Sequence, residues 1–558
     1  MLKSSVALLM LLGTINLVAQ KKDVVDESTI YDGIEFSMPK VKATNFPDYK
    51  VSISDFGAVK GGIVKNTDAF AKAINQVSSK GGGKIIVPRG IWLTGPITLK
   101  SNINLHLEDG SLIVFSDDFD DYKIIKTSYE GLNAYRCISP INANDLENIA
   151  ITGNGIIDGS GEAWRPVGQN QITASQWENR IKQGGVLSQN GKTWLPSEKA
   201  KKAFDNKIDF SSSGSITESE LNSIKDFLRP VMVSIVNSKR VLLDGPTFQN
   251  SPAWNLHPLM SEDVIIRNCK IRNTSYSQNG DGLDLESCKN ALVYNNTFDV
   301  GDDAICIKSG KDKDGRDRAI PTQNVIVKNN IVYHGHGGFV IGSEMSGGVK
   351  NVHVSNCTFI GTDVGLRFKS TRGRGGIVEN IYISNIDMIH ISADAIRFNM
   401  YYFSKEPILD GTGAQEDNIQ EPLVAVTEET PSFRDIFMKD ITVTDSGIAA
   451  FFMGLPEMNL KNVSLENAVF ETKKGIKAID ANGLTLSNVK IVASDDYALT
   501  LYNSKKVKTS GIIVDKSKAA IRILGSKTEN IQFDKKDFPN TNDILISKNV
   551  KKNAVKLQ

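Results

Sequence analysis

Cysteine is scarce in this chain of 558 residues, and no two cysteines form a Cys-x-x-Cys pair. The sequence therefore gives no support for a structural zinc site, which usually takes its ligands from such pairs. We expect buried thiols that pack as small apolar side chains. The five cysteines are Cys137, Cys269, Cys288, Cys306 and Cys357.

An excess of charge of one sign is also missing, because 65 Lys and Arg residues stand against 64 Asp and Glu residues. Without a bulk electrostatic field, we do not expect binding to nucleic acid or to a charged membrane surface.

Long apolar runs are absent beyond the N-terminus. Residues 1–20 join a basic Lys3 to a short apolar stretch from Val6 to Leu12, which is typical of a secretory signal peptide and too short to span a bilayer. No other stretch approaches about 18 apolar residues. We expect an exported monomer, periplasmic or secreted, without membrane insertion.

What the chain does contain is a repeated phrase. It reads EDVIIRNCKI at 262–271, KNALVYNNTF at 289–298, QNVIVKNNIV at 323–332 and KNVHVSNCTF at 350–359. A spacing that is often 20 to 30 residues marks a solenoid, and the alternation of apolar and polar residues marks strands. A second short strand, such as GLDLES or AICIKS, follows between copies. The pattern predicts an all-β fold, a right-handed parallel β-helix, rather than a propeller with blades of about 40–45 residues.

The ends and interruptions of the repeat define the domain organisation. We expect a lead-in segment at 21–50 and a single β-helix domain over 51–558. Asn66 or Thr67 should cap an amphipathic helix that plugs the first coil, with Phe70, Ala73, Ile74 and Val77 on its apolar face. Insertions at about 159–230, partly helical, and at 402–432 are either walls of a binding site or solvated loops.

Aligning the second strands places unusual side chains on one outward face. GDGLDLES falls on DDAICIKS, HGGFVIGS and DVGLRFKS, so that the apolar residues of each share one parity and point inward. Asp281 then lies beside Asp303, and Asp302 beside His336. The same face carries Lys308, Arg367, Lys369, Arg397 and Asn399.

The carboxyl groups on this face are spaced for acid-base chemistry. Parallel rungs are about 4.8 Å apart, so Asp281 and Asp303 can hold a water between them. Like charges at that distance raise one pKa, and Asp302 can remain protonated as a general acid. Two carboxyl roles of this kind are used in glycoside hydrolysis. His336 is placed to hydrogen-bond Asp302, while the arginine and lysine side chains suit an acidic sugar.

Four segments, NGDGLDLES, VGDDAICIKSG, GHGGFVIGSEMSGG and GLRFKSTRGRGG, resemble the motifs of the polygalacturonase family, glycoside hydrolase family 28. The resemblance extends from about Val51 to at least Met400. It implies a right-handed parallel β-helix that hydrolyses pectin. It also implies that Asp302 is the general acid, that Asp281 and Asp303 orient the water, that His336 is an accessory residue, and that Arg367 and Lys369 bind galacturonate.

The departures from the family pattern point to a subgroup. Gly280 replaces the usual Thr and Phe368 the usual Ile, and both resemble exo-acting bacterial members. SEMSGG (343–348) and SPAWNLHPL (251–259) do so too, and the latter would bring His257 to the site. We therefore expect galacturonate to be released from the non-reducing end of pectic polysaccharide or oligogalacturonide, through cleavage of α-1,4-galacturonosidic bonds.

Other interpretations stay open. The family resemblance implies inversion, whereas carboxylates about one rung apart would by the usual separation rule predict retention; we follow the resemblance. The alternatives are a hydrolase of rhamnogalacturonan or decorated pectin, a pectate lyase with calcium and an arginine base, and a non-catalytic carbohydrate-binding β-helix.

No cofactor is expected to be required, although one segment has the spacing of a calcium-binding loop. Its candidate ligands are Asp209, Ser211, Ser213 and Glu220. A helix that begins with a Thr217/Glu220 capping box explains the same segment equally well.

Overall fold

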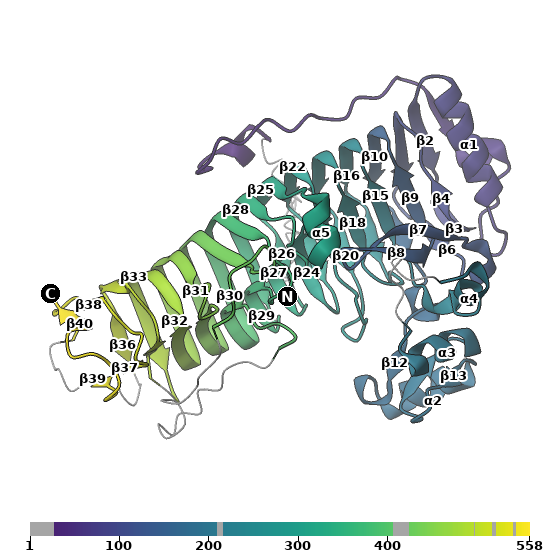
Figure 1. The fold of residues 1–558 in the computed structure, drawn as a ribbon. Coiled ribbons are helices and arrows are strands. Elements are labelled where there is room, and N and C mark those ends of the chain that lie inside the picture. Colours follow the sequence, from purple (N-terminus) through teal and green to yellow (C-terminus); the bar gives the residue numbers. More distant parts are fainter. Residues whose placement is uncertain (1–26, 209–215, 405–422, 496, 516–519, 539–542) are drawn as a thin grey trace, which may run out of the picture.

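The computed structural model describes residues 27–208, 216–404, 423–495, 497–515, 520–538 and 543–558. Its core is a right-handed parallel β-helix whose 35 strands are linked in one continuous sheet (Figure 1). The predicted fold is confirmed. The predicted signal peptide at 1–20 lies outside the described residues.

Each coil contributes strands to columns that run along the solenoid. One column carries the outward face singled out above and contains β9 (Ile141–Asn144), β15 (Val233–Val236), β18 (Leu256–Leu259), β21 (Leu283–Glu286), β24 (Asp303–Lys308), β27 (Gly337–Ile341) and β29 (Val364–Lys369). The repeated phrase forms the next column, with β10 (Glu147–Gly153), β16 (Lys239–Asp244), β19 (Glu262–Arg267), β22 (Lys289–Tyr294) and β25 (Thr322–Lys328). A third column contains β11 (Ile156–Asp158), β17 (Thr247–Gln249), β20 (Lys270–Arg272), β23 (Thr297–Asp299) and β26 (Ile331–Val332).

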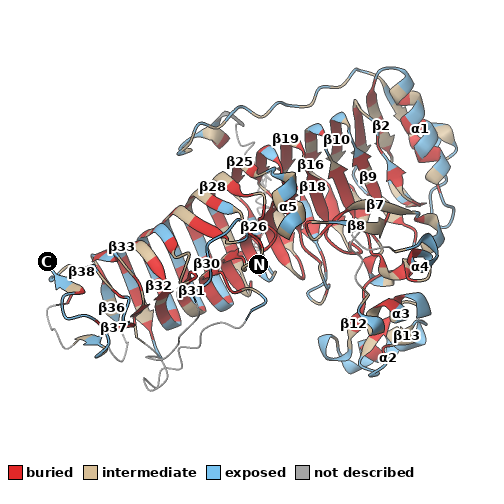
Figure 2. Cartoon of the chain, in the orientation of Figure 1, coloured by how far each residue is buried: buried red, intermediate tan, exposed pale blue. Residues whose placement is uncertain are grey.

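Toward the C-terminus the coils join these columns into long bent strands. They are β28 (Val349–Ile360), β30 (Ile377–Asn399), β31 (Ser432–Met453), β32 (Leu460–Ile479) and β33 (Ala481–Ala493). One cluster of buried apolar side chains extends from Ile53 to Ala554 through the interior (Figure 2). The inward parity predicted from the sequence is thus the parity of the core.

Asparagines at one corner of successive coils form a hydrogen-bonded ladder. Asn324 donates to Asn290 over 3.0 Å, and Asn351 donates to Asn324 over 3.1 Å. Asn380 continues the series with a 3.3 Å bond to Asn351. All four have φ between 56° and 58°, a left-handed conformation that asparagine tolerates better than most residues.

The N-terminal end is covered by α1 (Thr67–Ser79), as predicted (Figure 1). Its buried face holds the four predicted residues and Ala69. The expected cap is wrong in one respect: Asn66 occupies the N-cap position but makes no side-chain capping bond. Its amide instead accepts from Val59 N over 2.7 Å and donates to Leu93 O over 3.1 Å, because Asn66 is itself buried and its polar atoms need partners.

The lead-in segment lies along the outside of the coils. After η1 (Glu27–Tyr31) it has no regular structure, and Ile30 packs against Ile265 and Leu292 on the outer surface. Farther along, Glu35 Oε2 lies 2.6 Å from His353 Nδ1.

The first insertion forms a small unit beside the solenoid (Figure 1). It contains α2 (Ala174–Lys182), α3 (Glu198–Asn206), α4 (Glu218–Asn222) and an antiparallel sheet of β12 (Val167–Gly168), β14 (Thr193–Leu195) and β13 (Val186–Leu187). Trp177 and Trp194 pack with Tyr276, which precedes β21. Residues 405–422 of the second insertion lie outside the described part.

An antiparallel hairpin of β7 (Ile124–Tyr129) and β8 (Leu132–Cys137) is an element that the sequence did not predict. It reaches α5 (Asp312–Arg318), an excursion between β24 and β25. Lys311 N donates to Gly131 O over 3.0 Å, and Asn133 N donates to Asp314 Oδ2 over 3.0 Å. A hairpin that precedes β9 in the chain is thereby joined to the excursion that follows β24.

All five cysteines are buried and free, as expected. Among the described residues, no helix combines the length and the apolar character needed to cross a bilayer.

Candidate active site

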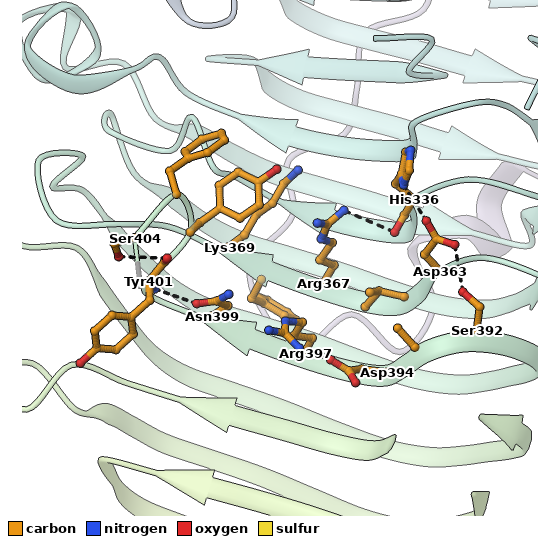
Figure 3. Close-up of a pocket in the computed structure, with 15 residues that line it drawn as sticks. His336, Asp363, Arg367, Lys369, Ser392, Asp394, Arg397, Asn399, Tyr401 and Ser404 are labelled. Atoms are coloured by element: carbon orange, nitrogen blue, oxygen red, sulfur yellow. Dashed lines mark hydrogen bonds and ion pairs between the residues drawn. The ribbon is translucent and has the colours of Figure 1, made fainter. Parts of the chain in front are cut away.

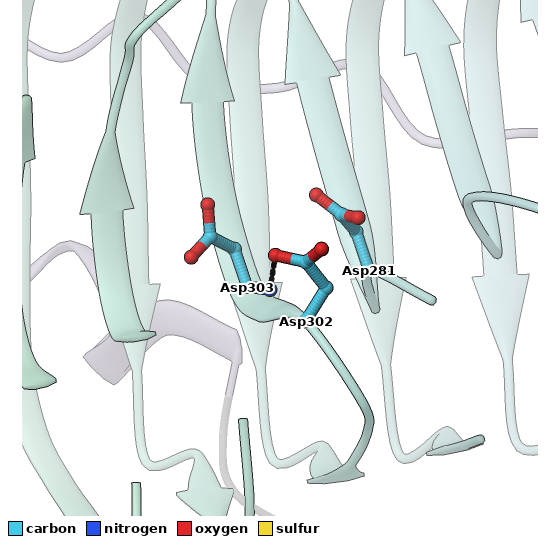
Figure 4. Close-up of side chains that lie close together, drawn as sticks. All are labelled: Asp281, Asp302 and Asp303. Atoms are coloured by element: carbon cyan, nitrogen blue, oxygen red, sulfur yellow. Dashed lines mark hydrogen bonds between the residues drawn. The ribbon is translucent and has the colours of Figure 1, made fainter. Parts of the chain in front are cut away.

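Three aspartates meet at the mouths of two neighbouring strands (Figure 4). Leu283 of β21 pairs with Ile305 of β24, and this register puts Asp281 beside Asp303. One carboxylate oxygen from each of Asp281, Asp302 and Asp303 lies within 4.8 Å of those of the other two. The acidic cluster predicted from the rung alignment is confirmed.

A close approach of two loops shapes this turn. A Cβ atom on Gly301 would lie 2.4 Å from Thr274 O, so only glycine fits before the two aspartates. Asp302 Oδ1 accepts a 2.9 Å hydrogen bond from Asp303 N, which orients the first carboxyl across the start of β24. The loop that carries Thr274 leads directly to Asp281.

Two cations hold Asp303 in its ionised form. Lys369 Nζ lies 2.6 Å from Oδ2, and Arg367 Nη1 lies 3.2 Å from Oδ1. Burial alone would raise the pKa of Asp303, but the charges of Lys369 and Arg367 outweigh it and hold the pKa well below its usual range. Both oxygens of this carboxylate are therefore engaged.

The pKa values of the other two carboxyl groups, those of Asp281 and Asp302, are shifted upward. Burial raises the pKa of Asp281 well above its ordinary value, and the neighbouring charges of Asp284 and Asp302 raise it further. Burial also raises the pKa of Asp302, and the charge of Asp303 adds to the effect. The site thus pairs one ionised carboxylate with two carboxyls that hold their protons more tightly, a division that suits acid-base catalysis.

His336 occupies the predicted position but has a different partner. Its backbone N donates to Asp302 O over 2.9 Å, which confirms the register. Its Nδ1 lies 2.6 Å from Asp363 Oδ2 on the next coil, so the expected ring contact with Asp302 is wrong. The hydrogen bond to Asp363 raises the pKa of His336 against the effect of burial, and the charge of Asp302 supports the rise.

Lys308 is enclosed in a cluster of acidic side chains, and its predicted contact with the substrate stays a prediction. It aligns in the column of Lys369, but its side chain is only 5% exposed and lies 3.2 Å from both Asp284 Oδ1 and Glu344 Oε2. The ammonium also lies 4.0 Å from the centre of the Trp254 ring. A buried cation needs such partners, which occupy it within the protein.

His257 is likewise enclosed rather than presented to a ligand. It is 1% exposed, and its Nε2 lies 2.9 Å from Glu286 Oε2. Glu286 also binds Arg318 of α5 over 2.6 Å. The segment 251–259 does reach the site region, as predicted, but His257 lies below its surface.

On the C-terminal side of the acids the face opens into a cavity of about 450 Å³ (Figure 3). Arg367 and Lys369 line it, together with Arg397 and Asn399 on the next coil, which pair with them in register. Arg397 Nη1 lies 2.5 Å from Asp394 Oδ2. The predicted register of these four residues is confirmed, whereas Lys308 of the same column is absent from the lining of this cavity.

On the N-terminal side of the acids, the hairpin packs against segment 251–259 through an aromatic stack. Tyr129, at the end of β7, stacks on Trp254 with ring centres 5.1 Å apart. The guanidinium carbon of Arg136 lies 3.7 Å from the centre of the Tyr129 ring. Arg229, at the end of the first insertion, donates to Pro252 O and Gln278 O over 2.9 Å and so fixes both flanking loops.

Several site residues were not singled out from the sequence. Asp284 alternates with the inward-pointing Leu283 and Leu285, so the rung alignment placed it on the outward face and contained the signal. Burial raises its pKa to about 6 despite the opposing charge of Lys308. Glu344 lies in SEMSGG. Burial would raise its pKa, but the charges of three cations, of which Lys308 has the largest effect, lower it to about 2. Nothing local in the sequence identified Asp363 or Tyr402.

Only part of the predicted calcium-binding loop lies within the described residues. Glu220 forms the capping box with Thr217 at the start of α4, the alternative given above. Asp209, Ser211 and Ser213 lie outside the described residues, so calcium binding there stays a prediction.

Comparison with known proteins identifies the family. The model described as Glycosyl hydrolases family 28 matches residues 166–445. A hyperthermoactive exopolygalacturonase from Thermotoga maritima superposes with a TM-score of 0.66 and 32% identity, over 86% of this chain and 94% of that one. The chain belongs to glycosyl hydrolases family 28.

Further relatives of this family 28 enzyme agree with the assignment. A probable polygalacturonase from Vitis vinifera is 25% identical over 84% of this chain and 83% of its own. An exo-poly-alpha-D-galacturonosidase from Dickeya chrysanthemi is 28% identical over 71% and 62%. The protein is a glycoside hydrolase of the polygalacturonase type, which decides against the lyase and the non-catalytic binding protein.

Proposed function

We propose that this enzyme removes single galacturonate residues from the non-reducing end of polygalacturonan with inversion at the cleaved carbon. The observation that carries the exo mode is the asymmetry of the catalytic face. Tyr129 and Trp254 close it on one side of Asp281, while the cavity lined by Arg367 and Lys369 opens on the other. A polymer bound across the acids from both sides would meet the hairpin.

In the proposed reaction Asp302 donates a proton to the glycosidic oxygen, since its raised pKa keeps it protonated into less acidic solution. Asp281 and Asp303 together hold the attacking water and accept its proton, with Asp281, whose pKa is raised, as the stronger base of the pair. The C–O bond to the leaving sugar breaks as the bond to the water oxygen forms.

The electrostatics support inversion in spite of the short carboxyl separation. A carboxylate whose two oxygens already bind Lys369 and Arg367 is a poor covalent nucleophile, because the ion pairs stabilise its negative charge. A water held between Asp303 and Asp281 is the better attacking group. The same cations suit the carboxylate of the adjoining galacturonate.

Product analysis tests both parts. Polygalacturonic acid should yield monomer from the earliest time points, and proton NMR of the nascent product should show the β-anomer from an α-linkage. Early oligomers would contradict the exo mode, and a nascent α-anomer would contradict inversion. Cleavage of rhamnogalacturonan but not polygalacturonic acid would overturn the substrate assignment. The signal-peptide pattern at 1–20 supports action after export, periplasmic or secreted.

A further inference from the structure

Phe403 is an exposed aromatic residue at the rim of the catalytic cavity. Its side chain is 78% exposed, compared with 42% for Tyr333, another exposed aromatic residue outside the cavity. It lines the same cavity as Arg367 and Arg397. An apolar ring held in water at a binding cavity gains free energy when a ligand covers it.

The backbone of Phe403 has an unfavourable conformation. Phe403 has φ of 67°, in the left-handed region that bulky residues rarely adopt. Such conformations persist where the surrounding structure imposes them, and they occur preferentially at ligand-binding positions. Phe403 lies in the segment after β30, whose last residue is Asn399.

Phe403 extends an aromatic surface that begins beside the catalytic cations. The Tyr402 ring lies 5.0 Å from Lys369 Nζ and 5.7 Å from the Arg367 guanidinium carbon. The Phe403 ring centre lies 4.1 Å from that of Tyr402, with the ring planes tilted by 56°. The two rings therefore lead away from the acids along the open side of the site.

Cations follow the same direction on the neighbouring strand. Arg397 pairs in register with Arg367, and Asn399 with Lys369. Adjacent coils are about 4.8 Å apart, a spacing close to the length of one pyranose ring. The arginine and the amide at this second position retain N–H donors for a carboxylate, one coil farther from Asp303, although Arg397 also pairs with Asp394 and Asn399 Oδ1 accepts from Tyr401 N.

We propose that Phe403, Arg397 and Asn399 form a second sugar subsite on the open side, which binds one further galacturonate of the substrate. The proposal rests on the proposed function. One face of a galactopyranose carries C–H bonds, which pack against the negative face of an aromatic ring. The Arg397 guanidinium then meets the carboxylate of the same sugar.

The test is the dependence of kcat/KM on substrate length. Digalacturonate fills only the positions on either side of the cleaved bond, whereas trigalacturonate also reaches the second subsite. The wild-type enzyme should prefer trigalacturonate. Phe403→Ala should lower kcat/KM for trigalacturonate roughly tenfold and leave digalacturonate unchanged. Phe403→Trp should retain the preference, and Tyr333→Ala should change neither substrate.

Digalacturonate hydrolysis serves as the folding control for every variant. An equal loss on both substrates would assign Phe403 a structural role, and no loss on either would overturn the subsite. A wild-type enzyme without preference for trigalacturonate would overturn it too. The proposed exo mode fails on a different result, the release of longer oligomers from the polymer, so the two failures are distinguishable.

Discussion

Two isosteric substitutions in the buried ion cluster around Lys308 should change the free energy of unfolding in opposite directions. Asp284 and Glu344 both lie 3.2 Å from Lys308 Nζ, yet their pKa values move apart. The pKa of Asp284 rises from 3.8 to about 6, whereas that of Glu344 falls from 4.5 to about 2. We expect Asp284→Asn to stabilise the protein at pH 7.5 and Glu344→Gln to destabilise it.

The magnitudes follow from these shifts. At about 1.4 kcal/mol per pKa unit, each shift of roughly two units corresponds to ~3 kcal/mol in the free energy of unfolding. Because the pKa of Asp284 is higher in the folded protein, its protonated form stabilises the fold. This contribution is fully present below pH 3.8 and is lost as the pH rises through about 6. The lowered pKa of Glu344 gives stability that is present above pH 4.5 and is lost as pH falls through about 2.

Equilibrium unfolding in urea, followed by tryptophan fluorescence, measures the difference, since Trp254 lies beside Lys308. Asp284→Asn should gain stability over the wild type at pH 7.5 and lose that advantage near pH 4. Glu344→Gln should be less stable at pH 7.5. A destabilised Asp284→Asn at pH 7.5 would show that attraction to Lys308 outweighs burial. A difference that does not change with pH would refute the electrostatic reasoning altogether.

Three further predictions concern activity. Asp302→Asn should lower kcat by about 10²–10⁴ while oligogalacturonate still binds, as calorimetry can show, and an unchanged kcat would remove Asp302 from the general-acid role. Lys369→Met removes a charge that lowers the pKa of Asp303, so the acidic limb of the kcat–pH profile should move to higher pH; a limb that stays in place would mean that another group controls it. Tyr129→Ala weakens the closed side, and digestion of polygalacturonic acid should then yield some longer oligomers, whereas a purely monomeric product would place the barrier elsewhere.

The parts of the molecule that repeat were predictable from the sequence. The alignment of GDGLDLES with DDAICIKS placed Asp281 beside Asp303, because a one-residue slip would turn the apolar side chains outward and the repeated phrase after each strand fixes the remaining choice of register. The same rule placed Arg397 behind Arg367. Where the repeat determines position, the amino-acid pattern and the geometry carry the same information.

The parts that depend on contacts across the groove were not predictable in this way. A rung alignment says which side chains share a face, but not which of them are already paired. Lys308 and Lys369 occupy the same column, yet one is enclosed by Asp284 and Glu344 while the other lines the cavity. The hairpin at 124–137 approaches from a distant coil, and no periodicity in its own sequence marks its destination.

The asparagine ladder has a consequence for how such a chain can change. Because Asn324 and Asn351 each bond to the equivalent residue of the neighbouring coil, the alignment of one coil is specified by the coil beside it. A whole coil could therefore be duplicated or removed by recombination at these corners while the flanking coils kept their alignment. The stretch from Asp281 to Lys369 is the exception, because its chemistry is assembled from consecutive coils and would be divided by any such event.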